Sequence, residues 1–149
     1  MRRLLPLFFA LLSLFAGSAR AEIIDIDNDQ LAKLQASGVP LIDVRTEGEW
    51  RDTGIVPGSR LLTFFNERGQ ANPSAWLERA RSIATPDKPV AVICRSGNRT
   101  QAVSRFLSEQ AGYRTVYNVK QGINQWLREG RTTSPAAPQL ANCQAGKAC

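Results

Sequence analysis

The sequence predicts an α/β domain in which a five-stranded, mostly parallel sheet lies between two layers of helices. Five short, largely apolar segments alternate with helical stretches between residues 22 and 131. The segment 89–93 is apolar on both sides, as expected of a central parallel strand. A chain of 149 residues is long enough for one such domain with a single core.

Turn and capping residues place the individual elements. Asp27 can cap a helix after the first strand, and Pro57 with Gly58 turns the chain into the third. Asn72 followed by Pro73 is a strong helix start, because proline is favoured at the first helical position. The expected strands are residues 22–26, 41–44, 59–65, 89–93 and 115–119. The expected helices are residues 28–36 and 45–52, a segment from Pro73 to Ile83, and residues 100–111 and 121–129.

The helix expected at 100–111 has an amphipathic pattern that predicts which of its sides is buried. Ser104 and Ser108 fall on the opposite side, so we expect them to face water. The expected buried stripe consists of Ala102, Val103, Phe106, Leu107 and Gln110.

Residues 1–21 have the layout of a secretory signal peptide. The start is basic, residues 4–15 are almost wholly apolar, and small residues precede an expected cleavage site between Ala21 and Glu22. The apolar run is too short for a membrane-spanning helix, which needs about twenty residues. We therefore expect an exported protein, periplasmic or secreted, with no stable membrane anchor after cleavage.

Composition and charge exclude several functions. The chain has no His, which rules out Ser-His-Asp and Cys-His catalysis and any His-ligated metal, and its 3 Cys are too few for an all-Cys zinc site. Residues 1–21 contain three Arg and no acidic residue, so their removal lowers the formal net charge from +6 to +3. Because the remainder lacks runs of Lys and Arg, we expect no nucleic-acid binding.

The segment from Cys94 to Arg99 carries the expected chemistry, because it joins the strand expected at residues 89–93 to a helix. Ligands of open α/β sheets bind at the carboxyl ends of strands, next to helix N-termini. Gly97 permits the positive φ that a tight loop needs, so backbone amides can converge on the Cys94 sulfur. These amides, the helix dipole and the charges of Arg95 and Arg99 would favour a thiolate. The alternative is that Cys94 is a small buried core residue.

The sequence Cys94-Arg95-Ser96-Gly97-Asn98-Arg99 resembles the active-site loop of the rhodanese family of sulfurtransferases. Residues 43–59 resemble the first signature of that family and residues 122–130 its closing signature, so the resemblance covers residues 22–131 in the right order. The chain departs from the family at residues 53–56, where a His is common, and at Gln121, where a second Gly is common.

The resemblance implies a single rhodanese-like domain with a three-layer α/β/α fold over residues 22–131. It implies that Cys94 takes a sulfur from thiosulfate or a similar small anionic donor, holds it as a persulfide, and passes it to cyanide or a thiol. Arg95 and Arg99 would hold the donor's sulfonate, and Ser96, Gly97 and Asn98 would complete the binding loop. No metal or organic cofactor is implied, and the resemblance does not fix the oligomeric state.

Asp43 and Arg45 lie at the end of the second expected strand and have two interpretations. They can contact the substrate, or they can form an ion pair that supports the loop, and we favour the supporting role.

Two rival functions belong to other classes. A non-catalytic or redox thiol protein could keep the same fold. Dual-specificity phosphatases share the architecture, but five residues separate Cys from Arg in their loop, whereas four separate Cys94 from Arg99 here. The smaller loop favours a single sulfur atom over a phosphate.

From residue 132 onward the composition predicts a flexible tail outside the core. The tail contains Cys143 and Cys149, for which the simplest prediction in an oxidising compartment is a small disulfide. The alternative is that one of them receives sulfur from Cys94.

Overall fold

The computed structural model describes residues 21–144. The predicted signal peptide lies outside these residues except for Ala21. Cys149 and the side chain of Cys143 also lie outside them, and with them the predicted disulfide. Across the described part of the chain, no helix is both long enough and apolar enough to span a bilayer.

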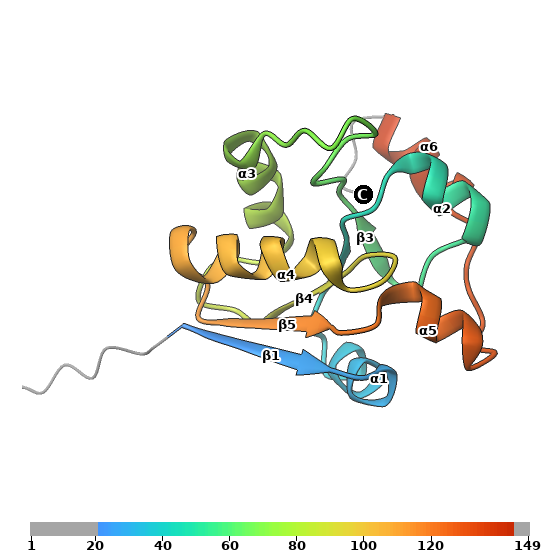
Figure 1. The fold of residues 1–149 in the computed structure, drawn as a ribbon, viewed down its shortest axis with the longest axis horizontal. Coiled ribbons are helices and arrows are strands. Elements are labelled where there is room, and N and C mark those ends of the chain that lie inside the picture. The colour runs from blue at the N-terminus through green and yellow to red at the C-terminus, as the bar shows by residue number, and fades with distance from the viewer. Residues whose placement is uncertain (1–20, 145–149) are drawn as a thin grey trace, which may run out of the picture.

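The described chain forms one parallel sheet with helices on both of its faces (Figure 1), which confirms the predicted fold class. The strands are β1 (Glu22–Ile26), β2 (Leu41–Asp43), β3 (Ser59–Leu61), β4 (Val90–Ile93) and β5 (Thr115–Val119). The helices are α1 (Asn28–Ala36), α2 (Glu47–Thr53), α3 (Pro73–Ile83), α4 (Asn98–Arg105), the π-helical turn η1 (Phe106–Gln110), α5 (Gly122–Arg128) and α6 (Ala137–Gln144).

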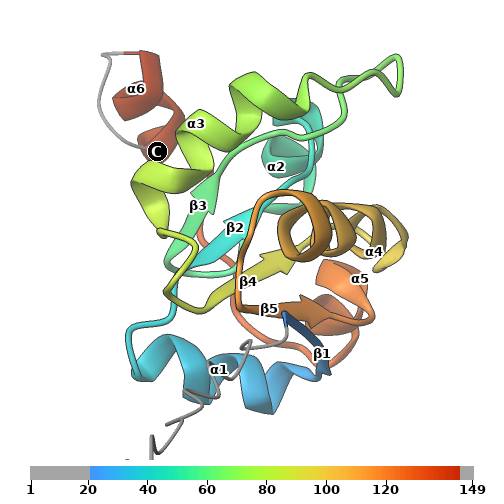
Figure 2. The same cartoon turned by 90° about the vertical axis from the view of Figure 1, so that its left-hand side faces the viewer.

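The strand order is β1-β5-β4-β2-β3, and every neighbouring pair is parallel. The central strand β4 is buried along its whole length, as predicted. Its side chains alternate between two cores. Val90 and Val92 pack with α3 and α4 on one face, and Ala91 and Ile93 pack with α1 and α5 on the other (Figure 2). This order puts the carboxyl end of β4 between those of β5 and β2.

The expected burial of the helix at 100–111 is partly wrong. The structure divides this segment into α4 and η1, and the amide of Ala111 bonds to the carbonyl of Phe106. Ser104 is fully buried and Ser108 is 9% exposed, whereas Ala102 and Gln110 face water. The buried side is rotated toward the serines because small side chains let the helix lie close to the sheet.

The prediction of a tail outside the core is wrong for residues 132–144. Ser134 and Ile55 exchange two backbone hydrogen bonds of 2.9 Å. Further along, α6 lies beside α2 (Figure 1) and buries Leu140 to 6% exposure. Together with Ala136, Leu140 covers an apolar patch formed by Trp50, Ile55 and Leu61. Among residues 132–142, Ala136 and Leu140 are the apolar side chains that contribute, and two residues are too weak a pattern to predict from the sequence.

Candidate active site

The loop after β4 places Cys94 at the carboxyl edge of the sheet, where the sequence predicted a site. Cys94 follows the last residue of β4 directly and is 1% exposed. Gly97 has a φ of +96°, the left-handed region that favours glycine, so the predicted tight turn is present. Four residues therefore suffice to pass from the end of β4 to the start of α4.

The loop is held by direct backbone contact with the turn between β5 and α5. A Cβ atom on Gly97 would lie 1.9 Å from the carbonyl oxygen of Lys120. A Cβ on Gly122 would lie 2.4 Å from the carbonyl oxygen of Cys94. That same oxygen accepts a 2.9 Å hydrogen bond from the amide of Ile123. The two glycines thus let β5 and α5 fix the backbone around Cys94.

Two groups of the loop contact the Cys94 sulfur. The amide of Gly97 donates a 3.1 Å hydrogen bond to Sγ. The hydroxyl of Thr100 lies 3.7 Å from Sγ and donates to the carbonyl of Gly97 at 2.9 Å. Thr100 is not among the predicted site residues, although a polar residue in the first turn of the helix after Cys94 is a usable signal. Thr100 is fully buried, so its hydroxyl belongs to the site.

Arg99 is already paired with a carboxylate. Its guanidinium makes a bidentate ion pair with Glu49 of α2, with N–O distances of 2.6 and 2.8 Å. Burial acts to raise the pKa of Glu49, but the hydrogen bonds from Arg99 and Thr46 and the charges of Arg99 and Arg45 outweigh it. The pKa of Glu49 is consequently lowered to about 2. The predicted anion-binding charge of Arg99 is therefore balanced by Glu49, which is not among the predicted site residues.

The remaining residues of the predicted loop face a cavity. Arg95, Ser96 and Asn98 are exposed, and with Arg99 they line one wall of a cavity of about 540 Å³. The other lining residues come from the start of α2 and from the loop between β3 and α3. They are Thr46, Glu49, Phe65, Asn66, Glu67 and Gly69.

Asp43 and Arg45 form a fully buried ion pair of 2.7 Å, in line with the favoured supporting interpretation. Arg45 also donates to the backbone carbonyls of Glu49 and Gly54, at 3.3 and 2.9 Å. The nitrogen that bonds Glu49, Nη1, also donates to the Thr53 hydroxyl at 2.7 Å. Thr53 is one of the positions where the chain departs from the resemblance. The pair therefore fixes α2, the helix that carries the partner of Arg99.

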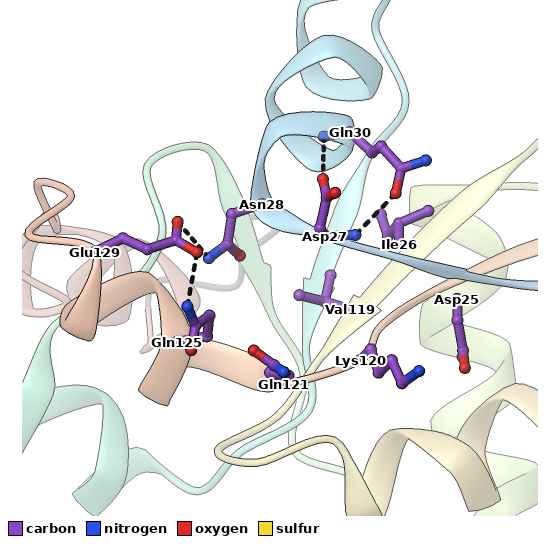
Figure 3. Close-up of a pocket in the computed structure, with 10 residues that line it drawn as sticks. All are labelled: Asp25, Ile26, Asp27, Asn28, Gln30, Val119, Lys120, Gln121, Gln125 and Glu129. Atoms are coloured by element: carbon purple, nitrogen blue, oxygen red, sulfur yellow. Dashed lines mark hydrogen bonds between the residues drawn. The ribbon is translucent and has the colours of Figure 1, made fainter.

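A second pocket, of about 300 Å³, lies beyond the β5–α5 turn and holds none of the predicted site residues (Figure 3). Lys120 and Gln121 of that turn line it. At its other end, hydrogen bonds from Asn28, Gln125 and Arg131 lower the pKa of Glu129 to about 2. Within residues 21–144, no group of three or more His, Cys, Asp and Glu side chains is placed to hold a metal ion.

The chain is similar to known proteins in both sequence and fold. Residues 27–129 match the profile of the rhodanese-like domain family. A sulfurtransferase of Allochromatium vinosum is 31% identical over 108 residues, covering 71% of this chain and 90% of the relative. Thiosulfate sulfurtransferase 18 of Arabidopsis thaliana is 28% identical over 119 residues, covering 77% of this chain and 86% of the relative.

Among solved structures, the polysulfide-sulfur transferase homodimer of Wolinella succinogenes is similar, with a TM-score of 0.58 and 25% identity. The match covers 78% of this chain and 81% of that one. The chain belongs to the rhodanese family, which confirms the resemblance found in its sequence.

The Glu49–Arg99 pair predicts a pH-dependent stability. The pKa of Glu49 is lowered from 4.5 to about 2 in the folded protein, so the stabilisation is complete above pH 4.5 and is lost as the pH falls toward 2. We expect Glu49→Gln to lower the free energy of unfolding by about 1 to 2 kcal/mol at pH 7, since the pair is partly exposed. The difference from wild type should shrink below pH 4.5, as measured by urea unfolding.

Glu47→Gln is the matched control on the same helix. Its carboxylate pairs with Arg51 at the surface, where both side chains are about half exposed, so we expect a loss of at most about 0.5 kcal/mol. A Glu49→Gln deficit that stays constant down to pH 2 would contradict the role given to this ion pair.

Proposed function

We propose that this protein is a sulfurtransferase that moves sulfane sulfur from thiosulfate, or a similar donor, to cyanide or a thiol through a Cys94 persulfide. The names of its relatives support sulfur transfer as the general reaction. The observation that carries the proposal is the position of Cys94, at the end of a central strand with its Sγ bonded to the amide of Gly97. An amide that donates to sulfur stabilises negative charge there without a neighbouring base.

In the first step the Cys94 thiolate attacks the outer sulfur of thiosulfate. A bond forms between Sγ and that sulfur, the S–S bond of thiosulfate breaks, and sulfite leaves with the electron pair. In the second step the acceptor attacks the outer sulfur of the persulfide. The bond to Sγ then breaks, and Cys94 is regenerated as a thiolate.

The residues around Cys94 have separate roles in this proposal. The Gly97 amide stabilises the thiolate before transfer and after it. The Thr100 hydroxyl, which donates to the Gly97 carbonyl in this structure, can rotate to donate to the sulfur when charge develops. Arg95 is exposed at the cavity and supplies a permanent positive charge for the sulfonate of the donor.

A phosphatase reaction fits this site less well. Besides the shorter spacing from Cys94 to Arg99, the Arg99 guanidinium is engaged by Glu49. A redox thiol function remains the alternative from another class, and it predicts no transferable sulfur on Cys94.

Thiosulfate loading tests the proposed reaction. Purified protein incubated with thiosulfate should gain the mass of one sulfur atom on the Cys94 peptide, release sulfite, and form thiocyanate when cyanide is added. Cys94→Ser should lose all three signals while keeping its fold, because the serine hydroxyl cannot form a persulfide. Hydrolysis of aryl phosphates without any thiocyanate would instead favour the phosphatase.

We also propose that the protein is exported by its first twenty-one residues, on the basis of their signal-peptide pattern. The protein recovered from the periplasm or the medium of an expressing bacterium should begin at Glu22 by N-terminal sequencing. Recovery from the cytosol alone, with residue 1 retained, would contradict export.

A further inference from the structure

Residues 132–144 pack against the domain although they lie beyond its rhodanese-like part, residues 27–129. The backbones of Ser134 and Ile55 exchange two hydrogen bonds of 2.9 Å. Further along, α6 lies beside α2 (Figure 1), where Leu140 is buried in an apolar cluster. This segment is therefore an addition to the family domain with defined contacts of its own.

The added segment contacts α2 at two places. In the middle of the helix, Trp50 is 4% exposed and packs in one cluster with Leu140. At the C-terminal end, a Cβ atom on Gly54 would lie 2.8 Å from the hydroxyl oxygen of Thr133. The carbonyl of Gly54 also accepts the 2.9 Å hydrogen bond from Arg45. The position of α2 therefore depends on the added segment as well as on Arg45.

Glu49 and Trp50 are consecutive residues of α2 that contact different parts of the molecule. Trp50 packs with Leu140 of the added segment. Glu49 holds the Arg99 guanidinium of α4 in the bidentate pair. Because this pair joins two helices, it persists only while α2 keeps its distance from α4. A displacement of α2 that exposes Trp50 would therefore also separate Glu49 from Arg99.

We propose that residues 132–144 regulate the anion affinity of the site by keeping Glu49 on Arg99. While the segment covers Trp50, the Arg99 guanidinium is engaged, and Arg95 is the cation that the loop presents to a donor. When the segment is released, α2 moves outward and a second guanidinium becomes available to the donor's sulfonate. Two cations bind an anion more tightly than one. This inference rests on the proposed sulfur transfer and names a regulatory element of that same site.

A double-mutant cycle followed by urea unfolding at pH 7 tests the link between the segment and the ion pair. Leu140→Ala removes an apolar contact of α6 with α2 and should loosen the helix. In that background, the factor by which Glu49→Gln raises the unfolding equilibrium constant should be about threefold smaller than in the otherwise unchanged chain. Glu47→Gln is the matched control. Glu47 pairs with Arg51 inside α2 and moves with the helix, so its factor should be equal in both backgrounds.

Thiosulfate binding tests the effect on anion affinity, and it is measured by NMR titration of Cys94→Ser protein, in which no persulfide can form. Adding Leu140→Ala should lower the dissociation constant about threefold, the effect of one partly exposed ionic contact. Glu49→Gln should lower it by a similar factor, about threefold, and the two changes together should bind no more tightly than Glu49→Gln alone. Leu140→Met should bind like the protein with Leu140, because methionine fills nearly the same volume. Leu127→Ala, the same change at an exposed residue of α5, should have no effect.

Equal Glu49→Gln factors in both backgrounds, or equal thiosulfate affinity in a folded Leu140→Ala protein, would overturn the proposal. In protein that retains Cys94, the loading rate at saturating thiosulfate should not change in Leu140→Ala, since the β5–α5 turn holds the Cys94 loop. A slower rate at saturation would also overturn it, because the segment would then act on Cys94. Wild-type protein that gains no sulfur from thiosulfate would count against the proposed reaction alone, because unfolding and binding are both measured without transfer.

Discussion

The close contact between the Cys94 loop and the β5–α5 turn is the constraint on which the site depends. Gly97 lies against the carbonyl of Lys120, and Gly122 lies against that of Cys94, at distances that leave no room for a side chain. The sheet order makes this contact available, because β5 is the direct neighbour of β4. With the backbone fixed on that side, the Gly97 amide is directed at the sulfur. In the proposed mechanism this uncharged donor stabilises the thiolate, so no neighbouring base is needed.

The cavity wall that faces the Cys94 loop includes residues of α2, and two separate sets of contacts hold this helix in place. Arg45, which forms a buried ion pair with Asp43, donates hydrogen bonds to the carbonyls of Glu49 and Gly54 and so holds the helix backbone. A buried ion pair is tolerated where the other hydrogen-bonding groups of its two side chains are also satisfied. Residues 132–144 then cover the outer side of α2 through Leu140. A well-anchored α2 keeps Glu49 on Arg99, so a loop with two arginines offers only one unpaired cation to a ligand.

The parts of the structure set by local sequence were predictable, and those set by distant contacts were not. The strand ending at Ile93 and the positive φ of Gly97 follow from β-branched residues and from one glycine. The pairing of Arg99 with Glu49 joins residues fifty positions apart, and no periodicity encodes it. The buried Ser104 shows the same limit, because an amphipathic pattern gives the polarity of a side chain and not how closely a helix approaches the sheet.

The most direct measurement of the central claim is the rate of sulfur loading from thiosulfate in Gly122→Ala compared with Gly112→Ala. Both glycines have positive φ, +59° and +78°, so both variants carry similar backbone strain. Only at Gly122 would the new Cβ meet the loop, at 2.4 Å from the Cys94 carbonyl oxygen, whereas nothing lies within 4 Å at Gly112. Gly122→Ala should load at least about tenfold more slowly, which is an increase of about 1.4 kcal/mol in the activation barrier, while Gly112→Ala should load like wild type. Equal loading in a folded Gly122→Ala protein would contradict it.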